Sequence, residues 1–295
     1  MLNYIKLNFK LMTKKKTFIV AFAVMLAIAI AIAFPFVTYI RYMKNFEFNM
    51  PAANSVFMAN TFMQCWDYLV VIFPFLVVFP YAMSFYDENK LGVKFYIQTR
   101  GDRKKYYFSQ IIVCFFGMFI IIAVSYSLNI ILNSILFPKD GNDYLSTISR
   151  YSINYVPNIL DDNLAMNVLS KGMSFKYLYI NYPQIYNLII TLIAATVGGV
   201  MSVAAYVFSL FVRQGKVFIL LFSFIVFEIF STIDTVLVSM AGKGKCYLMT
   251  SILNYMSTCT HSQAGKNYIY ILLVMLSFVI AEILVVKRKI KEDEL

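Results

Sequence analysis

The sequence predicts an all-α, polytopic membrane protein with six transmembrane helices and both termini in the cytoplasm. Two observations lead to this fold class: six long apolar runs, and a concentration of Lys and Arg in alternate connections between those runs. The composition agrees, because 60% of the residues are hydrophobic and 14% are charged. A soluble domain carries about 25% charged residues.

Each apolar run is long enough to cross the hydrocarbon core of a bilayer, about 30 Å thick, as a helix of about 20 residues. No water in that core can satisfy free backbone groups, so a single run must be helical there. The predicted spans cover residues 17–40, 64–86, 106–137, 185–212, 216–240 and 267–287.

The basic residues predict the orientation of these spans. With the N-terminus in the cytoplasm, 17 of the 26 Lys and Arg residues fall on the cytoplasmic side. Basic residues favour that side of a membrane, which supports an N-in, C-in topology. We therefore expect a multi-pass protein of the bacterial cytoplasmic membrane. Insertion and anionic lipid headgroups account for the net charge of +11 without a nucleic-acid partner.

Residues 1–16 precede the first span and predict an amphipathic helix in the cytoplasmic headgroup layer. Leu2, Ile5, Phe9 and Met12 recur at helical spacing, with lysines on the other side. The alternative is an unstructured basic leader that only orients the first span. The predicted organisation is thus this helix followed by a transmembrane domain over 17–295.

The connections outside the membrane are expected to be small. Residues 41–63 form a short polar loop, and residues 138–184 form the only sizeable soluble segment. A segment of fewer than about fifty residues buries little core by itself. Residues 241–266 are amphipathic enough to dip back into the outer leaflet. On the cytoplasmic side, residues 213–216 join the fourth and fifth spans in a tight hairpin.

No catalytic or metal-binding motif appears in the chain. A GxxxxGK[ST] phosphate-binding loop is absent, so the chain is not expected to hydrolyse ATP by itself. HExxH and GxSxG are absent too, and His261 is the only histidine. The four cysteines have no metal-ligand spacing, and a bridge between Cys246 and Cys259 stays open. The prediction is a protein that is not an enzyme and holds no metal or cofactor.

The connection between the second and third spans, residues 86–107, reads YDENKLGVKFYIQTRGDRKKYY. It is cytoplasmic in this topology, mixed in charge and rich in aromatic residues. An acid, a glycine four residues later, and then a basic and aromatic stretch resemble the first cytoplasmic loop of the type 2 ATP-binding-cassette (ABC) exporter permeases. The positions that carry this resemblance are Glu88, Gly92, Arg100, Arg103 and Tyr106. Gln110 stands where that family commonly has a Lys.

This resemblance implies a transmembrane subunit that couples a separate cytosolic ABC ATPase to the export of a peptide, a drug or a lipid-like substrate. Its loop would form a coupling helix seated in a groove of the ATPase, where ATP and magnesium bind. Two such permease subunits, identical or different, would form the transporter. A plainer interpretation of the basic residues is a membrane anchor on the cytoplasmic side.

Acidic side chains within spans are costly and usually have a reason. Glu228 lies near the middle of the fifth predicted span, and Asp234 lies closer to its outer end. Glu228 is interpreted either as a polar site for cationic cargo or as a hydrogen-bonding group between helices. Glu282 is expected to form an ion pair at headgroup level with the basic residues 287–289.

Three small residues at four-residue spacing, Ala194, Gly198 and Ser202, predict close helix packing by the fourth span. The sequence leaves open whether the neighbour is the fifth span or a second subunit. Two other functional classes also remain. One is an ion-coupled secondary transporter that uses Glu228 or Asp234, although the inverted repeat of such transporters is not visible. The other is a membrane anchor or sensor that binds an ATPase without moving cargo.

Overall fold

A computed structural model describes residues 1–42, 53–54, 56–59, 64–92, 102–137, 178, 181–212, 215–241, 252–257 and 268–294. Every regular element in these residues is a helix. The α-helices are α1 (Leu2–Lys14), α2 (Lys16–Tyr42), α3 (Gln64–Val78), α4 (Ser84–Lys90), α6 (Arg103–Leu136), α10 (Pro183–Ser209), α11 (Lys216–Ala241) and α12 (Tyr268–Glu294), and η2 (Ile252–Met256) is a short 3₁₀ helix.

Four of these helices, α6, α10, α11 and α12, are long and apolar enough to cross a membrane. The described apolar parts of α2 and α3 are shorter, at Lys16–Ala31 and Leu69–Val78. The chain is therefore a helical membrane-embedded protein, as its composition predicts. The apolar runs also locate most helices closely: the predicted 185–212 and 216–240 correspond to Pro183–Ser209 and Lys216–Ala241.

The prediction of one continuous helix over 64–86 is wrong. Helix α3 ends at Val78, and α4 begins only at Ser84 after a turn. Pro80 lies in this turn. A proline lacks the N–H that would continue the helical ladder and disfavours helical geometry in the residue before it. The break frees α4 to lie as a separate short helix at the end of the bundle.

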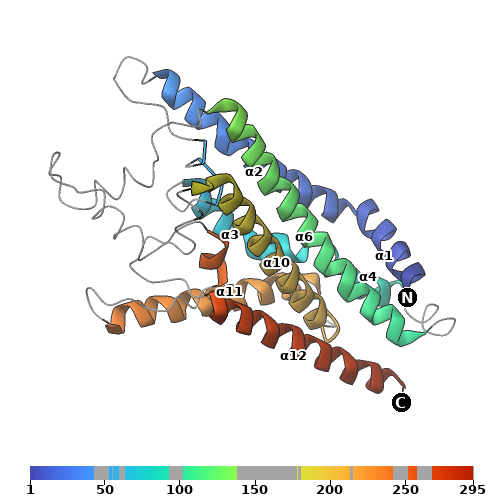
Figure 1. Ribbon diagram of the computed structural model, residues 1–295. Helices are drawn as coiled ribbons and strands as arrows, with labels where there is room; N and C mark the ends of the chain where they lie inside the picture. The colour runs from blue at the N-terminus through green and yellow to red at the C-terminus, as the bar shows by residue number, and fades with distance from the viewer. Residues whose placement is uncertain are drawn as a thin grey trace.

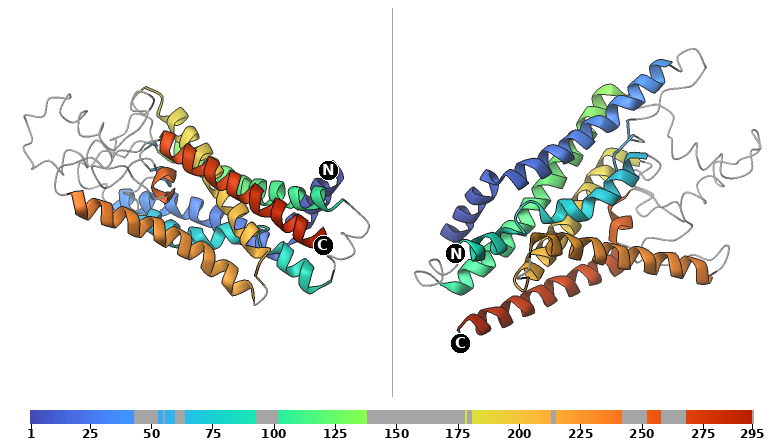
Figure 2. Two further views of the ribbon diagram at one scale, coloured as in Figure 1. Left: turned by 90° about the horizontal axis from the view of Figure 1, so that it is seen from below. Right: turned by 180° about the vertical axis from the view of Figure 1, so that it is seen from behind.

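Both termini lie at the same end of the helix bundle, which is also the end where α4 lies (Figure 1). Helix α10 packs most extensively on α6, and α6 also receives α2 and α1. Helices α11 and α12 flank this centre (Figure 2). In the most apolar stretch of α10, 67% of the residues are buried, against 17% in α11. Packing therefore holds α6 and α10 together as the core of the bundle.

The small residues of α10 face α6, which is neither of the two neighbours that the sequence left open. A Cβ added at Gly198 would meet the side chain of Ile122, and one at Gly199 would lie 3.1 Å from the backbone oxygen of Phe115. Ala194 and Ser202 on the same stripe are fully buried. Larger residues make the contact between α10 and α11. There the rings of Phe208 and Phe222 stack, with their centroids 3.9 Å apart.

Helix α1 forms where the sequence predicts an amphipathic helix, but its apolar face lies against protein. Met12 is fully buried, and Ile5 and Phe9 pack on the cluster of core residues at the same end of the bundle. These residues of the apolar face therefore pack on the bundle, and the expected position of α1 in the headgroup layer stays a prediction. The opposite side of α1 exposes Leu7 and Leu11 among lysines. Lys15 has an extended backbone, which ends α1 before α2 begins.

At the far end of α6, two asparagines bind a stretch of chain that the sequence predicts to be polar loop. The Asn129 side chain accepts from the backbone N–H of Met58 at 2.9 Å, and the Asn133 amide donates to the carbonyl of Val56 at 3.0 Å. Residues 56–59 are fully buried. This described part of 41–63 is thus apolar core rather than polar loop, because the two asparagines satisfy its backbone.

Candidate functional site

The short helix α4 ends in a backbone geometry that only glycine adopts readily. Gly92 has a φ of +72°, and its N–H donates to the carbonyl of Asn89 at 3.2 Å. A left-handed residue just past the last turn is a common helix stop. A Cβ at this position would meet nothing within 4 Å. The glycine is therefore required by the backbone, and no crowding within the described chain requires it.

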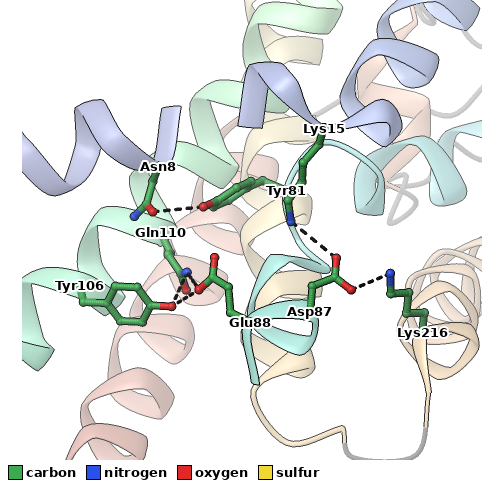
Figure 3. A network of polar contacts seen from close by, with 8 residues as sticks. All are labelled: Asn8, Lys15, Tyr81, Asp87, Glu88, Tyr106, Gln110 and Lys216. Atoms are coloured by element: carbon green, nitrogen blue, oxygen red, sulfur yellow. Dashed lines mark hydrogen bonds and ion pairs between the residues drawn. The ribbon is translucent and has the colours of Figure 1, made fainter. Parts of the chain in front are cut away.

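The carboxylate of Glu88 points from α4 into the bundle, as Figure 3 shows. Its Oε2 accepts hydrogen bonds from the hydroxyl of Tyr106 and, at 2.8 Å, from the amide nitrogen of Gln110. The carbonyl oxygen of Gln110 in turn accepts from the hydroxyl of Tyr206 at 2.7 Å. Glu88 thus connects α4 to α6 directly and to α10 through Gln110.

The neighbouring carboxylate, Asp87, points to two other helices. One of its oxygens lies 2.6 Å from the amine of Lys216, the first residue of α11, and the other lies 3.6 Å from the amine of Lys15, just before α2. Two adjacent acids on α4 therefore contact residues at or near the starts of three helices, α2, α6 and α11. We call Asp87, Glu88, Tyr106, Gln110 and Tyr206 the α4 network.

Helix α1 joins the same region through a side chain that the sequence did not single out. The Asn8 amide donates to the hydroxyl of Ser109 at 2.8 Å, and its oxygen accepts from the hydroxyl of Tyr81 at 3.2 Å. The amine of Lys15 lies 5.0 Å above the ring of Tyr81. A cation over an aromatic face is attracted to it. These contacts fix α1 beside the α4 network.

Burial makes the charges of this site sensitive to solvent. It raises the pKa of Glu88 above the ordinary 4.5, although the bonds from Tyr106 and Gln110 and the charge of Lys15 act in the opposite direction. Burial likewise lowers the pKa of Lys15 below its ordinary value, against the attraction of Asp87. A movement that admits water would stabilise both ionised groups. The protonation of the site is therefore linked to the position of α4.

Two of the five coupling residues predicted from sequence, Glu88 and Tyr106, bind each other in the structure. Gly92 ends α4, and Arg103 begins α6 with a partly buried side chain. Arg100 lies outside the described residues. Sequence reasoning noted Gln110 only as a departure from a family pattern. A buried amide one helical turn beyond Tyr106 in an apolar run was the available signal.

The acids within the spans lie apart from this site. Glu228 faces outward on α11, in a shallow apolar groove with Ile225 and Ile229, and has no polar partner among the described residues. The side chain of Asp234 lies outside the described part of the chain. Glu282 is only 7% exposed, so the expected headgroup ion pair is wrong for it. The nearby basic residues Arg288 and Lys289 instead contact Glu292.

In the part of the chain that the structure describes, no group of three or more His, Cys, Asp or Glu side chains could hold a metal ion. Comparison with known protein families, with curated proteins and with solved structures finds no match for the chain. The features of the molecule that bear on its function are therefore the geometry of the α4 network and the arrangement of the helices around it.

Proposed function

We propose that the chain is the transmembrane permease subunit of an ATP-driven exporter of the ABC type 2 family, working with a separate cytosolic ATPase. The observation that carries this proposal is the pair of acids on α4. Glu88 and Asp87 connect one short helix at the end of the bundle to α6, to α11 and to the segment before α2, and Gln110 extends the connection to α10. A displacement of α4 would therefore act on several long helices together.

A coupling element needs one face fixed to the bundle and another that a partner can contact. The inward face of α4 carries Phe85, which is 3% exposed, and the partly buried Glu88. Its C-terminal tip exposes Asn89, Lys90 and Leu91, and the side chain of Leu91 is 76% exposed. An apolar residue beside a lysine suits a groove with an acidic rim on the ATPase. ATP and magnesium would bind in that partner and close it against α4.

The positions of the termini and the exposed faces of the outer helices agree with the proposed topology and subunit contacts. Six spans with both termini in the cytoplasm of a bacterial cell agree with the shared end of the two termini in Figure 1. The largely exposed flanks of α11 and α12 leave room for lipids and for a second permease subunit. The cargo class stays broad, as a peptide, a drug or a lipid-like molecule.

The test is to purify the tagged protein in mild detergent from its own cells and to identify what accompanies it. We expect a stoichiometric cytosolic ATPase, which a Lys90→Glu, Leu91→Asp double variant loses. Lys291→Glu is the matched control, since Lys291 is an exposed base in the C-terminal turn of α12, at the same end of the bundle. A chain that purifies alone as a stable species would contradict the proposal, and so would equal loss in the control.

A second candidate function is an ion-coupled secondary transporter. The observation that favours it is Glu282, a buried carboxyl in α12 whose Oε1 has no hydrogen-bond partner among the described residues. A third, a non-transporting anchor or sensor, would bind the same ATPase. A change in ATPase rate on adding substrate would distinguish the permease from that anchor.

A further inference from the structure

Glu282 is a buried acid that the α4 network does not use. It lies near the middle of α12 on a stripe with Val286 and Ile290, which are almost fully buried. Its side chain is 7% exposed, and its Oε1 is fully enclosed without a hydrogen-bond partner in the described chain. Packing alone would be served by an apolar residue here, as it is one and two turns later. The carboxyl therefore needs a reason other than filling space.

The surroundings of Glu282 follow from the contacts between helices. The amine of Lys289 lies 5.7 Å from the ring centre of Phe211, just past α10, and both helices run toward the same end of the bundle. Seven residues back along each helix, Glu282 is level with Ala204. Two residues away, on the face of α10 that turns toward α6, Ser202 also has a fully buried hydroxyl without a partner in the described chain.

Helix α6 contributes the third group. It runs antiparallel to α10, and the bond between Tyr206 and Gln110 sets their register. One turn deeper, Ser202 is level with Cys114, whose thiol is fully buried. Helix α12 contacts both α6 and α10, and Cys114 is the titratable group of α6 nearest to this level.

No ion pair with Glu282 is found in the described residues. On α12 itself, Arg288 and Lys289 form ion pairs with Glu292. The titratable group nearest in register is Cys114 on α6 and Tyr206 on α10, and the hydroxyl of Tyr206 binds Gln110. On α4, Asp87 pairs with two lysines and Glu88 binds Tyr106 and Gln110. The titratable group of η2, Tyr255, lies only at the opposite end of the bundle. An ionised carboxylate at Glu282 would thus be buried without a counter-charge, which is costly.

We propose that Glu282 is a proton-binding site within the membrane-embedded bundle, at the junction of α6, α10 and α12. In the packed state it is a neutral carboxylic acid. Release breaks its O–H bond, leaves a carboxylate and transfers the proton to water that reaches the site.

The consequence is a link between protonation and packing. A carboxylate left between α12 and α10 favours water, so loss of the proton would loosen α12 from α10. The inference does not depend on the proposed exporter function, because it concerns the purified chain without a partner. It names the proton as ligand and leaves open whether a transport cycle uses it.

The test is infrared absorption of the whole protein in lipid bilayers at neutral pH, comparing the wild type with Glu282→Gln. We expect the wild type to show a neutral carboxyl C=O stretch at the high-frequency side, because this group accepts no hydrogen bond in the described chain. Glu282→Gln should lose that component. The matched control is Glu88→Gln, which should leave it in place, because Glu88 accepts two hydrogen bonds. Loss of a carboxylate band in Glu282→Gln, or no change in either band, would overturn the proposal.

A glutamine at 282 is close in shape to the protonated acid, so this variant should fold. If it does not, titration of the wild-type protein alone decides. The high-frequency component should be present at neutral pH and convert to a carboxylate band on adding base. Its absence at neutral pH would overturn the proposal as firmly as the variant would.

Discussion

Carboxyl groups in two regions of this molecule have opposite surroundings. At the α4 end, Asp87 and Glu88 have partners on several helices, within distances of hydrogen bonds and ion pairs. Deeper in the bundle, Glu282 has no partner in the described chain and Glu228 faces outward without one. In the first region, hydrogen bonds and ion pairs connect α4 to neighbouring helices, so that a displacement of α4 would displace them too. In the second region, packing holds the helices together. A carboxyl group there is stable only as the neutral acid or beside a ligand.

This difference indicates in which region a conformational change requires less free energy. Breaking the α4 network leaves several buried polar groups unpaired at once, so its parts should move together. In the described chain, the enclosed Oε1 of Glu282 makes no such bond, so packing and protonation decide how this part of α12 is held.

Glu88→Ala should destabilise the protein most. It removes the acceptor of the Tyr106 hydroxyl and one of the two acceptors of the Gln110 amide, and a buried group left without its partner costs about 1–3 kcal/mol. We expect a loss of about 2–4 kcal/mol, visible as a lower midpoint of thermal unfolding in detergent. Glu88→Gln keeps an acceptor at this position and should stay close to wild type. Equal loss in the two variants would mean that charge, and not hydrogen bonding, holds α4.

Gly199→Ala tests the packed region, where polar bonds contribute little. The added Cβ would lie 2.7 Å from the ring of Phe115 and 3.1 Å from its backbone oxygen, so α6 and α10 must separate slightly. Overpacking of this kind costs about 1–3 kcal/mol. Gly215→Ala is the matched control, because a Cβ there meets nothing within 4 Å. Equal unfolding midpoints for the two variants would show that the α6–α10 contact yields easily.

The pH dependence of stability tests the buried state of Glu88. Its folded pKa is raised above the ordinary 4.5, so between these two values the folded protein holds a proton that the unfolded chain has lost. Stability therefore falls as pH rises through this window and levels off above the folded pKa. Glu88→Gln should remove this part of the slope in unfolding measured from acid to neutral pH. An unchanged slope would place Glu88 in solvent.

The apolar runs were sufficient to predict the long helices, because length and hydropathy alone determine what spans a bilayer. Hydropathy alone does not mark the break after Val78, since the run continues to Phe85 without losing hydrophobicity, and the sequence signal there is Pro80, which disfavours a continuous helix. Helix α1 shows a related limit. Its periodicity predicts an amphipathic helix, but periodicity does not say whether the apolar face meets lipid or protein.

The candidate site was predictable only in part. Glu88 and Tyr106 stood out because charged and aromatic residues punctuate a cytoplasmic connection, but their mutual bond depends on how α4 turns back on α6. Asn8 and Gln110 gave only weak signals, as single polar residues within apolar patterns. Glu282 was misinterpreted, because nearness along the helix to basic residues suggested a pair. Its inward orientation is set by α10, which no local pattern reports.

Asp87→Asn should have the smallest effect. Its two ion pairs, with Lys15 and Lys216, are partly exposed, and such pairs contribute about 0–1 kcal/mol each. The loss should be measurable in low salt and fade in high salt, because exposed charges are screened. Thermal unfolding at the two ionic strengths, with Glu88→Ala in parallel, checks this. If Asp87→Asn lost as much stability as Glu88→Ala, and the loss persisted in high salt, the two acids would hold α4 equally. Helix α11 would then be coupled to α4 as firmly as α6 is.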